Sequence, residues 1–286
     1  MSEAGSVGLR RVLAGGEELL AYAAPSGLHP VGATLAELLG AGLLAVQEGV
    51  ERARELPPLS GPVETLAPVD RQEVWASGVT YERSVQARMA ETVVADVYDL
   101  VYRAERPELF LKAPAWRVPR PGAPLRIRGD STWDVPEPEL ALVLTAQREI
   151  AGYLVADDLS SRSIEGANPL YLPQAKIFDD CVSLSDTIVL AHDLAQDSRD
   201  LGVDMIISRN ERTVFEGATS TAQIVRSYEE LAGYLFRELS HPWGAVLMTG
   251  TGLVPPNEFT LEDGDSVEIA IEGVGRLRHS VYRSRR

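Results

Sequence analysis

The chain has 286 residues, of which 45% are hydrophobic and 24% are charged, so most of it is expected to fold around a core rather than stay disordered. Its 27 basic and 42 acidic side chains give a net charge of −15, which argues against nucleic acid or an anionic membrane as a partner. The sequence lacks a signal-peptide pattern and a membrane-length apolar run, and its single cysteine, Cys181, excludes an internal disulfide and a cysteine-based zinc site, so we expect a soluble cytoplasmic protein.

The N-terminal part of the chain differs in pattern from the rest. We expect a small domain over residues 1–68 and a larger one over residues 69–286. In the first domain, apolar residues recur at helical spacing over residues 34–56, and Thr34 and Glu37 form a capping box at the start. This pattern predicts one helix, which three glycines interrupt.

Strand patterns dominate the larger domain. Two further helices are expected over residues 82–104 and 225–240, the second with a capping box. Four stretches have strand or hairpin patterns: 139–145, 150–156, 203–217 and 266–281. The sequence therefore predicts an α+β protein with a mixed β core and a few peripheral helices.

The segment VPEPELALVL places two glutamates at the mouth of an apolar strand. Because side chains alternate along a strand, Glu137 and Glu139 share one face, about 7 Å apart along it. Pro138 lies between them and cannot donate a hydrogen bond to a neighbouring strand, so this end of the strand is expected to be an edge or an opening.

A second acidic group, Asp157-Asp158, ends the next predicted strand. If the two strands run side by side, one of these aspartates lies near Glu137 and Glu139. Three carboxylates with room for water favour Mg²⁺ or Mn²⁺ over zinc. On spacing alone the alternative stays open that the glutamates are exposed and the acidic turn is unrelated to them.

A loop-rich stretch follows directly after Asp158. Its polar side chains are Ser160, Arg162, Glu165, Asn168, Tyr171, Gln174 and Lys176. A long ordered loop within a compact domain often carries function, and the alternative is an ordinary surface loop.

Seven motifs occur in a fixed order between residues 73 and 281: GVTY, ELFLKAP, EPELALVL, GYLVADDLSSR, AKIFD, LMTGTG and GDSVEIAIEGVGRL. In this order they resemble the fumarylacetoacetate hydrolase family. The resemblance implies a β-roll or twisted β-sandwich core with peripheral helices, a small N-terminal α+β domain and usually a homodimer. It also implies Mg²⁺, or Mn²⁺ or Ca²⁺ in the same site, on Glu137, Glu139 and Asp158.

The same resemblance assigns further site residues and reveals one departure. The family's active-site lysine falls on Lys176, and its threonine in the Gly-Thr-Gly stretch falls on Thr251. Hydrolases of the family have an Asn-Tyr-x-x-His pattern in which the histidine activates water, but here Tyr81 is followed by Ser84 in the histidine position. None of the four histidines lies in a matching motif, so we expect them to be surface or structural residues, which argues against C–C bond hydrolysis.

The segments SSRSIEGANPLYLPQAK, WDVPEPELALVL and RPELFLKA are similar to a subgroup of the family, the 2-keto-3-deoxypentonate (arabinonate or xylonate type) dehydratases. That similarity implies an acid/base role for Glu108. Ser163 stands where the subgroup usually has aspartate, which leaves the identity of the sugar acid open.

The resemblance implies a lyase mechanism on a small-molecule 2-keto acid. The cation stabilises an enolate formed when the C3 proton leaves, and Lys176 adds positive charge or forms a Schiff base. Glu108 is the expected base at C3 and acid for the C4 hydroxyl, with Glu165 as a second candidate. The product is 2,5-dioxopentanoate, which places the enzyme in oxidative pentose breakdown.

Six residues are expected to bind the substrate or shape its pocket: Ser160, Arg162, Tyr171, Gln174, Thr251 and Tyr81. For Arg162 the alternative is a salt bridge that holds the turn, and for Tyr81 it is core packing.

Two other functions compete with dehydration. One is a hydrolase, decarboxylase or isomerase of acylpyruvate-like diketo acids, in which Glu82 or Glu108 replaces the missing histidine. The other is a non-catalytic metal-binding scaffold, against which the intact set of Glu137, Glu139, Asp158 and Lys176 argues.

Overall fold

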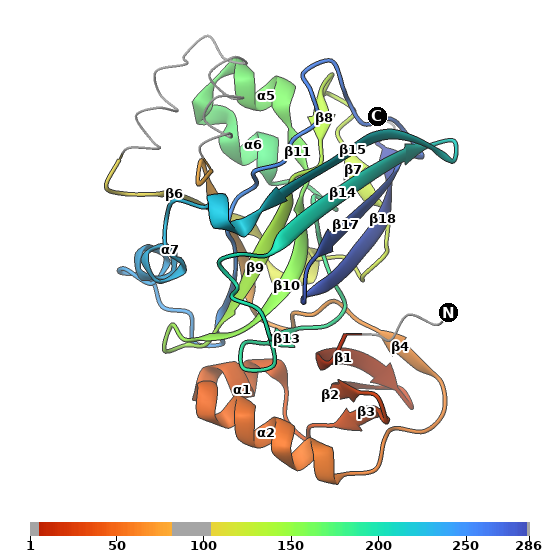
Figure 1. Ribbon diagram of the computed structural model, residues 1–286, viewed down its shortest axis with the longest axis vertical. Helices are drawn as coiled ribbons and strands as arrows, with labels where there is room; N and C mark the ends of the chain where they lie inside the picture. Colours follow the sequence, from red (N-terminus) through yellow and green to blue (C-terminus); the bar gives the residue numbers. More distant parts are fainter. Residues whose placement is uncertain (1–5, 82–103, 285–286) are drawn as a thin grey trace.

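The computed structural model describes residues 6–81 and 104–284 (Figure 1). Near the N-terminus, two helices accompany a four-stranded antiparallel sheet of order β3-β2-β1-β4. These elements are β1 (Gly8–Ala14), β2 (Glu17–Ala24), β3 (Gly27–Pro30), α1 (Leu35–Ala41), α2 (Leu43–Glu55) and β4 (Val63–Thr65). They lie together below the larger sheets in Figure 1, and the boundary at residues 68/69 stays a prediction.

The single helix predicted over residues 34–56 is two helices in the structure. Its capping box is confirmed, because Thr34 Oγ1 accepts a hydrogen bond from the Glu37 amide and the Glu37 carboxylate accepts one from the Thr34 amide. The break comes at Gly42, whose φ of 106° is unfavourable for any residue with a Cβ. The Gly42 amide still donates to Leu38 O and closes the first helix.

The main sheet has the strand order β12-β10-β9-β16-β5-β6, and β13 also pairs with β10. Its strands are β5 (Glu73–Gly78), β6 (Glu108–Ala113), β9 (Pro138–Leu144), β10 (Ile150–Asp158), β12 (Val182–Leu184), β13 (Val189–Leu190) and β16 (Ala245–Met248). The two strands predicted over 139–145 and 150–156 are thus confirmed, and they run antiparallel as neighbours.

A second sheet has the order β15-β14-β17-β18-β7 and packs across the main sheet (Figure 1). Its strands are β7 (Leu125–Ile127), β14 (Gly202–Arg209), β15 (Arg212–Ser220), β17 (Ser266–Ile271) and β18 (Gly275–Arg283). Both predicted hairpins are confirmed, as β14–β15 and β17–β18. A two-stranded pair, β8 (Asp134–Val135) and β11 (Ser160–Ser161), lies beside it.

The remaining helices are short. They are α5 (Arg162–Ala167), α6 (Leu172–Lys176), α7 (Tyr228–Leu235) and the 3₁₀ turns η1 (Ala115–Arg117), η2 (Pro169–Tyr171) and η3 (Thr221–Gln223). The helix predicted over 225–240 is therefore shorter than expected. Ser227 caps it by accepting from the Glu230 amide, but the Glu230 carboxylate pairs with Arg226. The helix predicted over 82–104 falls on residues 82–103, outside the described residues.

Strand β9 is buried on both faces, which explains why it reads as a continuous apolar run. Leu140, Leu142 and Leu144 belong to the core between the two large sheets. Ala141 and Val143 belong to a second core, which the main sheet shares with the N-terminal elements. The expected α+β class with a mixed β core is confirmed.

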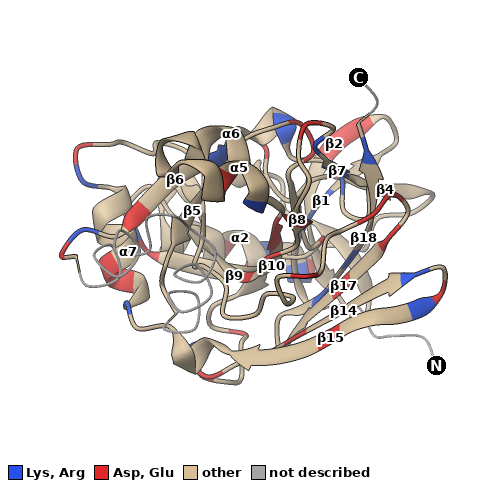
Figure 2. Cartoon of the chain, turned by 90° about the horizontal axis from the view of Figure 1, so that it is seen from above, with Lys and Arg blue, Asp and Glu red and all other residues tan. Residues whose placement is uncertain are grey.

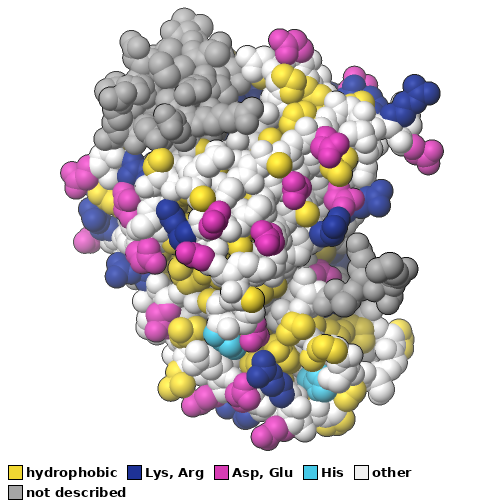
Figure 3. All heavy atoms as spheres, viewed as in Figure 1, with side chains coloured by type: hydrophobic (Ala, Val, Ile, Leu, Met, Phe, Trp, Pro, Cys, Tyr) yellow, Lys and Arg dark blue, Asp and Glu magenta, His cyan; other side chains and the backbone are white. Residues whose placement is uncertain are grey.

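On the face shown in Figure 3, acidic and basic side chains are interspersed rather than gathered by sign. Cys181 is buried. Within the described ranges, no helix is long and apolar enough to cross a membrane.

Strand β8 buries one carboxyl group away from the sheet cores. Asp134 is 1% exposed, and the nearest ion-pair partner given by the geometry is Arg283, whose Nη1 lies 3.8 Å from Asp134 Oδ2. Burial raises the pKa of Asp134 to about 6, against which the Ser131 hydroxyl and Arg283 act more weakly. Folding therefore disfavours the ionised form of this carboxyl group.

We expect Asp134→Asn to stabilise the protein at neutral pH and to have no such effect in acid. An acid whose pKa rises from 3.8 to about 6 on folding binds more protons folded than unfolded, so stability falls as pH rises between these values. The gain is up to about 3 kcal/mol above pH 6 and vanishes below about pH 4. Urea denaturation across this range measures it, with the exposed Asp204→Asn as the control. An equal stability change at acid and neutral pH would contradict the assignment.

Candidate metal centre and active site

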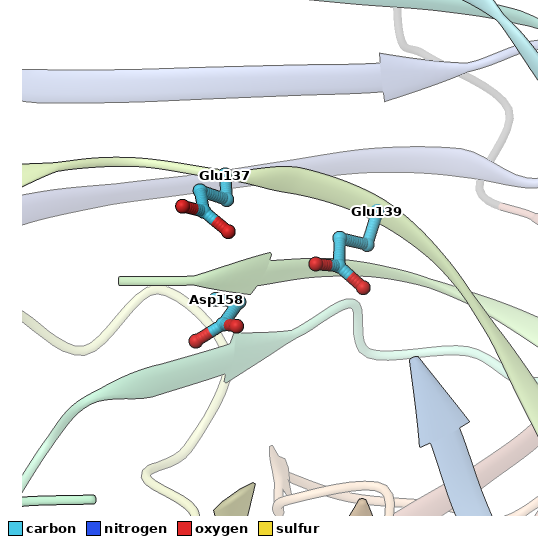
Figure 4. A group of neighbouring side chains, drawn as sticks. All are labelled: Glu137, Glu139 and Asp158. Carbon is cyan, nitrogen blue, oxygen red and sulfur yellow. The ribbon is translucent and has the colours of Figure 1, made fainter. Parts of the chain in front are cut away.

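Three carboxylates meet where β9 begins and β10 ends. Glu137 and Glu139 lie two residues apart, and Asp158 lies opposite Glu137, where its amide donates to Glu137 O at 3.0 Å. Each of the three offers a carboxylate oxygen within 4.8 Å of the others, and all three side chains are buried (Figure 4). The predicted cluster is thus present, and because side chains alternate along β10, Asp158 joins it while Asp157 faces the opposite side.

The strand end at Pro138 is open on one side, as the sequence predicted. Strand β16 pairs with β9 only from Ala141 onward, so β10 is the ladder partner at Pro138. The chain that leaves β16 then turns across this end, where the Gly250 amide donates to Glu139 Oε2 at 2.6 Å. The same turn brings Thr251 to the carboxylates.

Basic side chains surround the three carboxylates. Lys176 Nζ lies 2.8 Å from Glu137 Oε2 and 2.9 Å from Asp158 Oδ2, and it donates to Ser160 Oγ at 2.5 Å. Arg162 Nη2 donates to Glu137 Oε1 at 2.9 Å. In Figure 2 the acidic and basic segments of α5 and α6 lie next to one another. Lys176 therefore lies beside the acidic residues, where the family resemblance placed it.

A second lysine in the site was not predicted from the sequence. Lys112 is fully buried, and its Nζ lies 2.5 Å from Asp158 Oδ1, with further hydrogen bonds to Leu159 O and Lys176 O. Its spacing gave no reliable signal, because the β5–β6 ladder has a register shift at Lys112 that interrupts the alternation of side chains along β6. Recognising it required knowing that β6 lies close to the end of β10.

The carboxylates strain one another electrostatically. Burial raises the pKa of Glu139 well above its ordinary value, and the nearby Asp158 and Glu137 raise it further, while Lys176 and the Gly250 amide oppose the rise. A divalent cation would relieve this repulsion, and an all-oxygen donor set is what Mg²⁺, Mn²⁺ and Ca²⁺ take in proteins. The residues present therefore fit a hard cation.

A narrow cavity of about 10 Å³, room for about one water molecule, adjoins the carboxylates. Besides the three carboxylates, it is lined by Ser77, Gly78, Val79, Phe110, Arg162, Lys176, Gly250 and Thr251. Val79 has a φ of 54°, which is costly for a β-branched residue, and strain of this kind concentrates at functional sites.

Glu108 lies against Gly78, which lines this cavity, but it is not itself one of the lining residues. It faces Gly78 across the β5–β6 ladder, and a Cβ on Gly78 would lie 1.8 Å from Glu108 Oε2. Only glycine leaves room for the carboxylate there. Glu108 is thus held within the same neighbourhood as the acidic trio and Lys176.

The other predicted site residues divide into two groups. Glu165 is buried beside Arg162, with 3.7 Å between Glu165 Oε2 and Arg162 Nε. Tyr171 and Gln174, by contrast, are exposed and do not line the described cavity. Tyr81 lies in the core between the large sheets, where burial raises the pKa of its phenol and the ring packs against Gly252.

The four histidines lie away from the cavity. His29, His241 and His279 are buried, and His192 is exposed. None of them lines the cavity beside the carboxylates. This matches the expectation of surface or structural histidines, although three of the four are internal.

Comparison with known proteins assigns the chain to a family. The model of the C-terminal part of fumarylacetoacetate (FAA) hydrolase matches residues 73–282. The chain belongs to the fumarylacetoacetate hydrolase family. The family resemblance in the sequence is therefore confirmed.

Two relatives are similar over most of their length. The probable 2-keto-3-deoxyxylonate dehydratase of Haloferax volcanii is 50% identical over 214 residues, which cover 75% of this chain and 73% of the relative. The 2-dehydro-3-deoxy-D-arabinonate dehydratase of Saccharolobus solfataricus is 40% identical over 228 residues, which cover 78% and 76%.

A solved structure extends the likeness to almost the whole chain. It is 2-keto-3-deoxy-D-arabinonate dehydratase complexed with magnesium and 2,5-dioxopentanoate, with 32% identity and a TM-score of 0.81 over 97% of this chain and 99% of that one. The β-roll type of core that the resemblance implied is thus confirmed, together with the mixed sheets and peripheral helices.

We expect Lys112→Met to destabilise the metal-free protein by about 3 kcal/mol, because it removes one of the two lysines that contact the buried Asp158 carboxylate. Added Mg²⁺ should restore more stability to this variant than to the wild type, since the ion replaces the missing charge. Thermal denaturation with and without Mg²⁺ measures both effects. Equal gains from Mg²⁺ in the two proteins would show that Lys112 does not share the charge of the site.

Proposed function

We propose that this protein is a Mg²⁺-dependent dehydratase that converts a 2-keto-3-deoxypentonate into 2,5-dioxopentanoate. The observation that carries the proposal is the buried trio of Glu137, Glu139 and Asp158 with Lys176 held across two of its members. The two relatives at 50% and 40% identity are named as dehydratases of such sugar acids. The similar structure with magnesium contains 2,5-dioxopentanoate, the product that the proposed reaction forms.

The acidic trio would hold the ion through one carboxylate oxygen or more from each residue. When bound, Mg²⁺ supplies a Lewis acid that stabilises negative charge on the 2-oxo oxygen of the substrate. Arg162 orients Glu137 through its hydrogen bond to Oε1. The Gly250 amide does the same for Glu139.

Lys176 serves as a fixed positive charge in this proposal. Its Nζ is surrounded by the carboxylates of Glu137 and Asp158 and the hydroxyl of Ser160, and two carboxylates stabilise an ammonium group over a neutral amine. A Schiff base needs the neutral amine as a nucleophile. The contacts therefore favour an electrostatic role, in which Lys176 stabilises the enolate oxygen and carboxylate of the substrate.

Glu108 is the proposed acid/base group. It removes a proton from C3 and then protonates the departing C4 hydroxyl, so that water leaves. A proton shift from C5 to C3 in the resulting unsaturated alcohol gives an enol between C4 and C5, and transfer of the enol hydroxyl proton to C4 then gives the aldehyde of 2,5-dioxopentanoate. The contact of Glu108 with Gly78, which lines the cavity, supports this role over Glu165, which faces Arg162.

Pocket roles for the remaining residues follow from their positions. Thr251 lines the cavity and is proposed to bind the substrate's carboxylate or hydroxyls. Ser160 acts by holding Lys176. Tyr171 and Gln174 are exposed and stay predictions, and the burial of Tyr81 in the sheet core favours its packing role.

The partners, oligomeric state and location of the enzyme are inferred in general terms. A small 2-keto acid is the proposed partner, by analogy with the named relatives. The homodimer stays a prediction from the family. A cytoplasmic location is proposed because the relatives are metabolic enzymes and the chain has one cysteine, which is buried.

We expect the purified protein with Mg²⁺ to form 2,5-dioxopentanoate from racemic 2-keto-3-deoxypentonate, and EDTA to abolish the reaction. Proton NMR follows the products over time. In parallel, acetylpyruvate should stay intact, because the histidine needed to activate water is missing from the cavity. Acetate and pyruvate formed from acetylpyruvate, with the pentonate untouched, would replace the dehydratase with a C–C hydrolase.

Two variants localise the chemistry in the same assay. Glu108→Gln should lower kcat by about 10²-fold or more with little change in Mg²⁺ affinity, because it removes an acid/base group but no ligand. The exposed Glu258→Gln is the matched control and should behave as wild type. Wild-type kcat in Glu108→Gln would transfer the acid/base role to Glu165.

A further inference from the structure

A second buried polar pair lies on the opposite side of β10 from the carboxylate trio. Asp157 faces away from Asp158 and into the core between the two large sheets, where its Oδ2 lies 2.8 Å from His279 Nε2. Both side chains are fully buried. Burying polar groups in such an apolar core costs free energy unless they are hydrogen-bonded.

His279 comes from the second sheet, not from the sheet that carries the carboxylates. It lies on β18 between Leu277 and Val281, which point into the same core. Its other ring nitrogen, Nδ1, lies 3.1 Å from Ser280 O. Since the Asp157 carboxylate accepts hydrogen bonds, Nε2 is placed as the donor to it, and the contact of Nδ1 with Ser280 O helps to fix the orientation of the ring.

The second oxygen of Asp157 links this pair to the metal centre. Asp157 Oδ1 accepts a hydrogen bond from the main-chain amide of Glu137 at 2.9 Å. The next residue, Asp158, donates its own amide to Glu137 O at 3.0 Å. Both the amide and the carbonyl group of Glu137 are thus hydrogen-bonded to residues of β10, although Glu137 lies just ahead of β9.

We propose that His279 is a positioning residue for the metal centre, which acts through Asp157 on the main chain of Glu137. The inference rests on the proposed cation site and adds a residue from outside it. His279 fixes the Asp157 carboxylate, the carboxylate fixes the Glu137 amide, and the Glu137 carboxylate is thereby aimed at Glu139 and Asp158. Hydrogen bonds from residues outside the ligand set orient the ligands of a metal site, and their loss weakens the affinity for the metal.

The neighbouring residues show why packing alone does not account for the pair. Leu277 and Val281 flank His279 on the same strand face, so an apolar residue would suit the surrounding core. A buried hydrogen-bonded pair is often no more stabilising than apolar residues of similar size. The bond from Asp157 to the Glu137 amide gives this pair a specific structural consequence at the site.

We expect His279→Leu to weaken Mg²⁺ binding by about 10- to 100-fold, measured by isothermal titration calorimetry on folded protein. His279→Gln keeps one donor for Asp157 and should recover part of the affinity. The matched control is His241→Leu, because His241 is also buried but packs between Trp75 and Phe236 away from the carboxylates. Circular dichroism and thermal denaturation check that each variant is folded.

A double-mutant cycle tests the proposed route. In an Asp157→Asn background, His279→Leu should change the Mg²⁺ affinity little, since the group that transmits its effect is already altered. Independent, additive losses would overturn the route through Asp157. Unchanged Mg²⁺ affinity in both His279 variants, with only a lower melting temperature, would make the pair purely structural and overturn the proposal. If the wild type itself binds no Mg²⁺, the cation site fails and the inference fails with it.

Discussion

Mutual repulsion among three buried carboxylates is the constraint on which the rest of the site depends. Glu137, Glu139 and Asp158 are brought together by strand register, and burial removes the water that would screen them. Lys112 and Lys176 both contact Asp158, and each also donates to neighbouring oxygens, so the cations are as firmly placed as the acids. This arrangement favours a divalent ion, and it does not need the ion in order to form.

The two-sided burial of β9 and β10 makes this placement possible. One side of the main sheet packs on the N-terminal elements, and the other packs on the second sheet. At the end where the apolar residues stop, the first side presents the carboxylate trio and the second presents Asp157. The same register therefore fixes the metal ligands and the hydrogen-bonded pair that supports them.

Short-range patterns in the sequence predicted the strands, the hairpins and the shared face of Glu137 and Glu139, because these depend on side-chain alternation. The family resemblance supplied Asp158, Lys176 and Glu108, which spacing alone left open. The helical pattern could not predict the break at Gly42, because the sequence shows where glycines lie but not which of them takes a positive φ.

Long-range contacts were not accessible from the chain order. Lys112 and Asp158 are brought together by the packing of β6 near β10, and nothing near Lys112 in the sequence indicates an ion pair. His279 is 122 positions from Asp157 and belongs to a different sheet. Tyr171 and Gln174 belong to the polar loop next to the site but are exposed, and their pocket roles stay predictions.

The most direct test of the account is the position of a bound cation. We would grow crystals of the protein with Mn²⁺ and collect anomalous diffraction data. We predict one strong peak within about 2.5 Å of carboxylate oxygens from Glu137, Glu139 and Asp158. A crystal at saturating Mn²⁺ with no peak there, or with the ion held by other residues, would contradict it.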